Sequence, residues 1–75
     1  MDSSLTVTGE ECPMNYVRVK LRLETLAVGQ VLEAFVDEGE AARNVPRSAT
    51  EEGHEVLLTE PARAGVVRVV IRKQS

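Results

Sequence analysis

The residue best suited to chemistry is Cys12, the single cysteine of this 75-residue chain, which directly precedes Pro13. Proline is favoured at the first position of a helix, and apolar residues at helical spacing follow it here. We therefore expect the sulfur of Cys12 at a helix N-terminus, where unpaired N–H groups and the helix dipole stabilise an anion. Because the thiolate is the nucleophilic form of cysteine, this position predicts a reactive thiol.

The acidic residues that precede the thiol have the opposite effect. Glu10 and Glu11 adjoin Cys12 in the chain, and their charges disfavour a thiolate by up to about 1 kcal/mol if they are close and well solvated. The helix dipole and the two carboxylates could therefore nearly cancel. From these residues, a reactive cysteine and a structural cysteine both remain open.

The remaining polar residues form no recognised catalytic or metal site. His54 is the single histidine, and we expect it at the start of a strand with its ring facing solvent. One cysteine and one histidine cannot supply the ligands of a structural zinc site, and the sequence has neither a P-loop nor a Gly-x-Ser-x-Gly motif. We therefore expect no metal and no cofactor, and interpret Asp37, Glu38 and Glu40 as a solvated turn.

The composition indicates a small, acidic domain with an aliphatic core. The net charge is −3 and the isoelectric point is about 5.1, which disfavours nucleic-acid binding through phosphate neutralisation. Tyr16 and Phe35 are the only aromatic residues, so Val and Leu must supply most of a thin core. The sequence shows no secretory signal and no apolar run long enough to span a bilayer. We expect one domain, residues 1–75, in the cytoplasm with a reduced thiol.

Six elements must position these residues, and apolar periodicity gives their expected ranges. The ranges are a strand at 5–8, a helix at 13–26, a strand at 31–36, a helical segment at 40–52, a strand at 54–59 and a strand at 66–72, with a turn at 60–65 between the last two strands. Because Pro46 lacks an N–H and disfavours helical geometry at Val45, we expect the second helix to break and restart at Pro46. Right-handed crossovers then predict an α/β two-layer sandwich, β-α-β-α-β-β, with a four-stranded mixed sheet and two helices on one face.

The first helix carries two apolar stripes and a basic set. The stripe that should pack on the sheet consists of Tyr16, Val19, Leu23 and Leu26. The second stripe, Met14, Val17 and Leu21, must meet another helix or a partner. The basic residues are Arg18, Lys20 and Arg22. We expect these three side chains to face solvent, with the alternative that they steer an acidic partner toward the thiol.

Four blocks of sequence occur in a characteristic order and spacing. They are ECPMNYVRVKLRLE at 11–24, GQVLE at 29–33, NVPR at 44–47 and GHEV at 53–56. In this arrangement the chain resembles the TusA (SirA-like) family of sulfur carriers, and the likeness covers nearly the whole chain. One position departs from the family signature Cys-Pro-x-Pro, because Asn15 stands where the second proline is expected.

The resemblance implies a site and a place in a sulfur relay. The last strand would lie between the second and third strands of the sheet, and Cys12 would accept sulfane sulfur as a persulfide. In the sulfur-carrier hypothesis, Pro13 would fix the start of the helix, and Asn15, which stands in place of the second proline, would orient or bond the terminal sulfur. The donor would be a cysteine desulfurase or a rhodanese. The acceptor would be another sulfur-relay protein, serving tRNA thiolation, molybdenum cofactor synthesis or sulfur oxidation.

The sulfur-carrier hypothesis includes a docking surface, and two alternative functions remain open. The carrier would be a monomer of the sulfurtransferase type, and whether it is an enzyme stays open. Its partners would contact a surface formed by Met14, Val17 and Leu21, with Arg18 and Lys20 nearby. The alternative is a non-catalytic interaction module that uses the same helix surface and does not need its cysteine. A third hypothesis, RNA binding by analogy with related two-layer folds, is disfavoured by the acidic charge.

Overall fold

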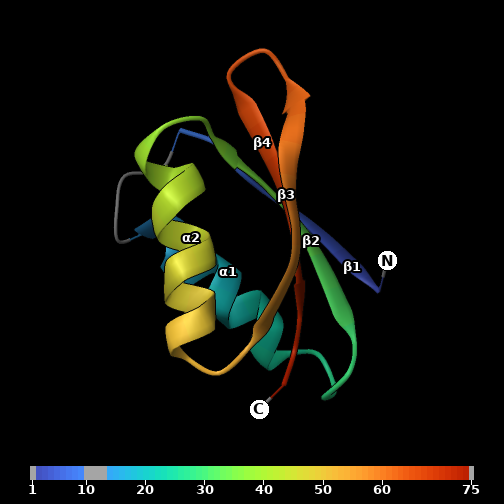
Figure 1. Cartoon of the computed structure of the whole chain (residues 1–75). Helices are drawn as coiled ribbons and strands as arrows, with labels where there is room; N and C mark the ends of the chain where they lie inside the picture. Colours follow the sequence, from blue (N-terminus) through green and yellow to red (C-terminus); the bar gives the residue numbers. More distant parts are fainter. Residues whose placement is uncertain (1, 10–13, 75) are drawn as a thin grey trace.

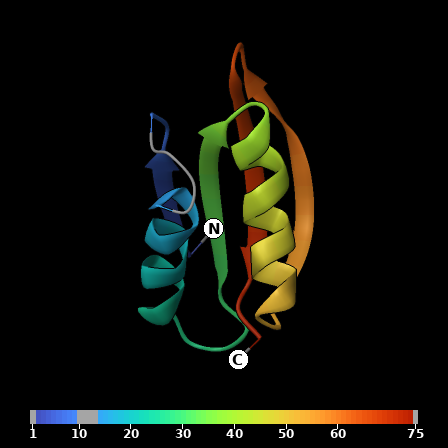
Figure 2. The same cartoon turned by 90° about the vertical axis from the view of Figure 1, so that its left-hand side faces the viewer.

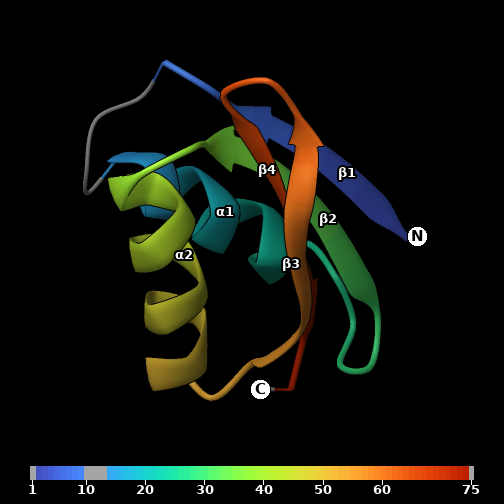
Figure 3. The same ribbon diagram turned by 45° about the horizontal axis from the view of Figure 1, so that its top comes forward.

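A four-stranded sheet and two helices pack as two layers in the computed structural model, which describes residues 2–9 and 14–74 (Figure 1). The elements are β1 Ser3–Val7, α1 Met14–Glu24, β2 Val31–Asp37, α2 Glu40–Glu51, β3 Glu55–Arg63 and β4 Val66–Arg72. Figure 3 shows α1 and α2 side by side on one face of the sheet. The predicted α/β sandwich and its order of elements are therefore confirmed.

The sheet is mixed, and its strand order is β1-β2-β4-β3. Strands β1 and β2 are parallel, whereas β4 runs antiparallel to both β2 and β3. The last strand thus lies between the second and third, as the family resemblance implied. This order places the carboxyl ends of β1 and β2 at the same edge of the sheet, next to the start of β4.

The core lies between the sheet and the helices and is aliphatic. In β2 the inward side chains alternate, and Leu32, Ala34 and Val36 are fully buried. Helix α1 contributes Val19 and Leu23, which are 0% and 1% exposed. The predicted sheet-facing stripe of α1 is confirmed, because its other two members, Tyr16 and Leu26, pack against the same cluster.

Helix α2 corrects one prediction, because it runs without a break from Glu40 to Glu51 with Pro46 inside it. Its inward residues Ala41, Val45 and Ala49 recur once per turn and are buried against the sheet. Burial of a valine gains about 1.5–3 kcal/mol, so packing of these residues offsets the roughly 3 kcal/mol cost of an interior proline. Among the described residues, no helix is long and apolar enough to cross a membrane.

Strand β3 corrects a second boundary. It continues through Pro61 to Arg63, where a turn at 60–65 was expected, and only Ala64 and Gly65 form the turn. Figure 2 shows the resulting β3–β4 hairpin extending past the end of β2. Because β3 is an edge strand, a proline can occupy it without removing a ladder hydrogen bond. The pairing also shifts register between Pro61 and Arg63.

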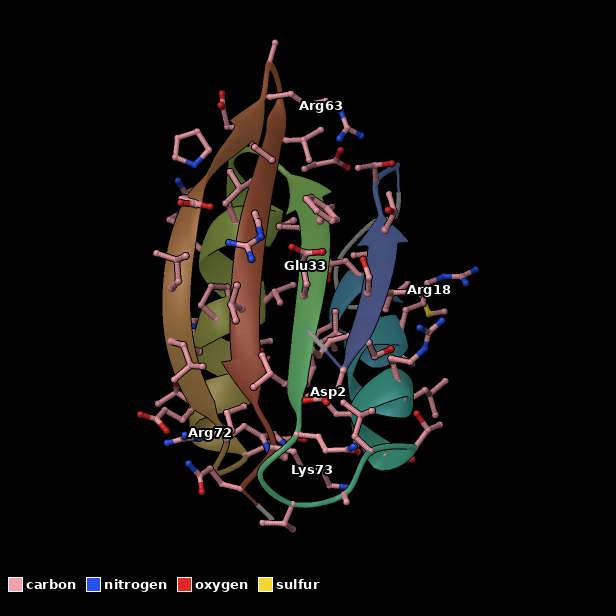
Figure 4. The ribbon with its side chains drawn as sticks, turned by 90° about the vertical axis from the view of Figure 1, so that its right-hand side faces the viewer. Asp2, Arg18, Glu33, Arg63, Arg72 and Lys73 are labelled. Carbon is pink, nitrogen blue, oxygen red and sulfur yellow. The ribbon has the colours of Figure 1, made fainter. Side chains whose placement is uncertain are left out.

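The face of the sheet opposite the helices carries a charged network. Arg68 of β4 lies between Glu33 of β2 and Glu60 of β3, and its Nη1 donates to Glu60 Oε2 at 2.9 Å. Arg68 Nε donates to Glu33, whose carboxylate lies in the middle of this face (Figure 4). The hydrogen bond from Arg68 is the main cause of the lowered pKa of Glu33.

Candidate functional site

The predicted thiol site falls between two described elements. Cys12 and Pro13 lie outside the described residues, as do Glu10 and Glu11. Strand β1 ends at Val7, and helix α1 begins at Met14. A helix therefore begins within two residues of Cys12 in the sequence, as expected.

On the β1 side of this segment, the backbone is held by Asp37. The N–H of Gly9 donates to Asp37 Oδ2 at 2.8 Å. Gly9 has a φ of 79°, a left-handed conformation that favours glycine. Asp37 was interpreted as part of a solvated turn, and the two residues are 28 positions apart. Their contact follows from the parallel pairing of β1 and β2, which local spacing does not reveal.

On the α1 side, Asn15 is buried at the start of the helix. It is 2% exposed and is the one buried polar residue identified in the described part of the chain. Its Oδ1 accepts a hydrogen bond from the backbone N–H of Tyr16 at 2.6 Å. This contact satisfies one of the first N–H groups of the helix, which have no partner within the helix. The predicted contact between Asn15 and a sulfur atom stays a prediction.

The second apolar stripe of α1 remains largely open. Met14 and Leu21 are 49% and 57% exposed, and Val17 is partly buried. No helix in residues 2–9 and 14–74 covers this stripe, which leaves a partner as the predicted contact. Beside it, Leu5 of β1 and residues of α1 and the turn after it line a shallow groove of about 300 Å³. These residues are Arg18, Leu21 and Arg22 of α1 and Thr25, which directly follows the helix.

The basic residues of α1 have different surroundings. Arg18 is exposed and projects beyond the β1 edge of the sheet (Figure 4). Lys20 is exposed and pairs with Glu52 of α2's C-terminal end at 3.6 Å. Arg22 was expected to face solvent but is partly buried, because its Nη1 donates to Ser3 Oγ and to the Ser4 carbonyl, both at 3.0 Å. Arg22 therefore ties α1 to β1.

His54 also differs from expectation. It is partly buried, and its Nδ1 accepts a hydrogen bond from the Gln74 N–H at 3.2 Å. It lines a small cleft of about 160 Å³ at the C-terminal ends of the two helices, together with Lys20, Glu52 and Lys73. In the described ranges, no group of three or more side chains could hold a metal ion. The cleft lies away from Met14, at the opposite end of α1.

A solved structure with the same fold is a SirA-like protein from Desulfitobacterium hafniense. It covers 97% of this chain and 99% of its own, with a TM-score of 0.83 and 24% sequence identity. At this identity the likeness shows the fold.

Sequence comparisons extend to the family. A protein named as a candidate sulfur carrier from Archaeoglobus fulgidus is 39% identical over 70 residues, which are 93% of this chain and 80% of the relative. The sulfur carrier protein TusA of Pseudomonas entomophila is 31% identical over 74 residues, 99% of this chain and 91% of the relative. The family model described as sulfurtransferase TusA matches residues 4–73. With a match of this length, the chain belongs to the sulfurtransferase TusA family.

Proposed function

We propose that this protein is a sulfur carrier that takes sulfane sulfur onto Cys12 as a persulfide and passes it to an acceptor protein. The observation that carries the proposal is the family match over residues 4–73, a range that includes Cys12. Two relatives are named for sulfur carriage. The cysteine also stands two residues before Met14, the first described residue of α1, and a helix dipole favours a thiolate near its N-terminus.

Loading is an exchange that resembles thiol–disulfide chemistry. The Cys12 thiolate attacks the terminal sulfur of a donor persulfide, R–S–SH. A bond forms between Sγ and that sulfur, the S–S bond of the donor breaks, and the donor leaves as its thiolate, R–S⁻. The product is Cys12–S–SH. The sulfane sulfur keeps its oxidation state through the exchange, so no external oxidant or reductant is needed.

Delivery follows from the cysteine count. Because Cys12 is the single cysteine, no second thiol of the chain can expel the sulfur by forming an internal disulfide. The persulfide is therefore retained until a thiolate of the acceptor protein attacks its terminal sulfur, by the same exchange as in loading. The carrier regains its Cys12 thiolate, and the acceptor becomes the persulfide.

The protein surface proposed for docking is the open face of α1. It consists of Met14, Val17, Leu21, Arg18 and Lys20. Exposed apolar area beside cationic groups suits a partner with an apolar contact and carboxylates around it. This face begins two residues after Cys12 in the chain, which lets a docked partner reach the sulfur. Pro13 would fix the helix start there, and Asn15 would act from the first turn.

The carrier needs one partner that supplies sulfur and one that receives it. We propose a cysteine desulfurase or a rhodanese as the donor. The acceptor would be a sulfur-relay protein of tRNA thiolation, molybdenum cofactor synthesis or sulfur oxidation. We further propose that the carrier works in the cytoplasm as a monomer of one domain.

The decisive experiment is intact mass spectrometry after incubation with a cysteine desulfurase and cysteine, or with polysulfide. We expect a gain of about 32 Da per sulfur atom that a reductant removes. Cys12→Ser should keep the fold and gain nothing. If the wild-type mass does not change although the thiol still alkylates, the carrier proposal fails and a non-catalytic interaction module takes its place.

A further inference from the structure

We propose that the open edge of β1, with the groove beside it, binds an extended acidic segment of a partner protein, which adds to the sheet as a strand. This inference deepens the proposed function and rests on it, because it says what kind of segment a sulfur donor or acceptor presents to the carrier. The strand order is β1-β2-β4-β3, so in the described part of the chain β1 pairs with β2 alone.

The two edge strands of the sheet are protected against further pairing to different degrees. β3 contains Pro61, charged residues and two register shifts, which are features that hinder the addition of another strand. β1 has the sequence SSLTV, with neither a proline nor a charged residue, and it pairs with β2 in unbroken register. The β1 edge is therefore better suited to accept a strand.

Backbone groups of β1 face this open edge. Arg22 of α1 reaches the edge, and its Nη1 donates to the Ser4 carbonyl at 3.0 Å. Because the backbone groups of a strand alternate between its two edges, the N–H and the carbonyl of Thr6 face the same side as the Ser4 carbonyl. Ser4 and Thr6 are both exposed. An added strand therefore finds a donor and an acceptor at Thr6, beside the carbonyl that Arg22 occupies.

The groove beside this edge determines which side chains suit the added strand. Leu5 and Leu21 form its apolar part, and Leu21 is 57% exposed. Arg18 and Arg22 line the same groove, and Arg18 projects beyond the β1 edge (Figure 4). An added strand turns every second side chain toward α1, at intervals of about 7 Å. Because Arg18 and Arg22 stand about 6 Å apart along the helix axis, successive side chains on that face can meet the apolar part and a guanidinium in turn.

The charges of the groove favour carboxylates on the bound segment. In the described ranges, both contacts of Arg22 use Nη1, and a guanidinium carries five N–H donors, so donors remain for a carboxylate. The acidic edge strand of this chain, β3, is a poor occupant for the groove of a second copy. Its carboxylates Glu55 and Glu60 are already paired with arginines of β4, which leaves a partner protein as the source of the segment.

The probe is a synthetic peptide of about seven residues, in which a central leucine and a glutamate two positions to either side alternate with threonine. It is titrated into the isotope-labelled full chain, and binding is followed by the amide shifts in NMR spectra. The shifts should concentrate on β1 and on the groove residues of α1, and binding should weaken with added salt. A peptide with lysine in place of glutamate, and one methylated on its backbone nitrogens, should each bind at least about tenfold more weakly.

Variants of the protein test the groove itself. Arg18→Glu should weaken binding of the acidic peptide about tenfold and strengthen binding of the lysine peptide. Arg43→Glu is the matched control, because it makes the same change of charge at an exposed residue of α2, and it should bind like the wild type. Leu21→Gln should weaken binding about threefold through lost apolar contact. Circular dichroism and thermal melting establish folding, and if Arg18→Glu does not fold, Leu21→Gln and the three peptides decide the question.

Several outcomes would overturn the inference. They are a peptide that causes no shifts, shifts centred on α2 or β3, equal binding of the methylated peptide, and equal weakening by Arg43→Glu and Arg18→Glu. Shifts of β1 that depend on the concentration of the free protein would also overturn it, because a second copy would then occupy the edge.

Sulfur loading, followed by mass without any peptide, tests the proposed function separately. A protein that loads sulfur and ignores the peptide loses only the β1 edge as a docking site. A protein that binds the peptide at β1 but takes up no sulfur contradicts the sulfur-carrier proposal and keeps the docking site.

Discussion

Tyr16 shows how one side chain couples the two helices. Its hydroxyl donates to Glu52 Oε1 at 3.1 Å. Burial of the phenol raises its pKa well above the usual 10.0, and the nearby Glu52 charge and the hydrogen bond act in the same direction. The folded state therefore keeps a proton that the unfolded chain releases at high pH. The stability that this adds is complete below pH 10 and is lost progressively as the pH rises above it.

We predict that Tyr16→Phe reduces this alkaline loss. The free energy of unfolding, measured with denaturant at pH 8 and pH 11, should fall more between the two values for the wild type than for Tyr16→Phe. All other groups that titrate in this range are common to both proteins, so the difference isolates the phenol. Equal losses would show that the phenol ionises similarly in the folded and unfolded states.

At single residues, sequence reasoning was strongest where the residue type itself limits the chemistry. Cys12 stands out because no other thiol exists in the chain. The roles of Asp37 and Arg22 were missed, because each depends on a neighbour in another element. The sequence did hold a signal for the Gly9–Asp37 contact. Parallel strands end at the same edge of a sheet, so residues near the ends of the first two strands, here Gly9 and Asp37, are expected to lie close together.

Among the elements, α1 combines a buried stripe with an exposed one. The buried stripe follows from helical periodicity and was predicted. The exposed stripe matters for function only if a partner covers it, and its residues contribute little to the core: Leu21 is 57% exposed. A substitution there should therefore separate partner contact from folding.

We predict that Leu21→Gln lowers the efficiency of persulfide transfer from a donor protein about five- to tenfold, as for truncation of a central interface residue. Loading from polysulfide and thermal stability should stay near the wild-type values, because glutamine is a good helix former. Val28→Gln is the matched control, since Val28 is 64% exposed but lies outside α1. Equal transfer by the two variants would place the docking surface elsewhere.

Periodicity predicted the kind and order of the elements but not all of their bounds. The first strand was expected at 5–8 and is Ser3–Val7, and the first helix was expected to reach residue 26 and ends at Glu24. β4 has the predicted range, 66–72, and the helix stripe of α1 is correct. Pro46 misled because its local cost was weighed without the burial of α2. The turn expected at 60–65 was too long because β3 is an edge strand, where Pro61 is tolerated. Both corrections depend on neighbours in space, which local sequence does not contain.

At the scale of the whole molecule, the position of β4 in the sheet determines which charged side chains form ion pairs on its outer face. With β4 between β2 and β3, Arg68 reaches Glu33 on one side and Glu60 on the other. Spacing along the chain gave a mixed sheet, but the order of its strands came from the family resemblance. The ion pairs across three strands could therefore not be derived from spacing.

This network should make the fold sensitive to acid. The hydrogen bond from Arg68 is the main cause that lowers the pKa of Glu33 below its usual 4.5, while partial burial opposes it. Because the folded state favours the charged carboxylate, its contribution to stability is present above pH 4.5 and is lost as the pH falls through the folded pKa.

We therefore predict that Glu33→Gln makes the free energy of unfolding less dependent on pH between 7 and 3 than in the wild type. The effect should vanish in an Arg68→Met background, where Glu33 has lost the group that lowers its pKa, so the double-mutant cycle tests the pair directly. A pH dependence that Glu33→Gln leaves unchanged would mean that the carboxylate titrates alike in both states. In that case, ionisation of Glu33 would add nothing to the stability of the fold, and the backbone pairing of β2, β4 and β3 would hold without it.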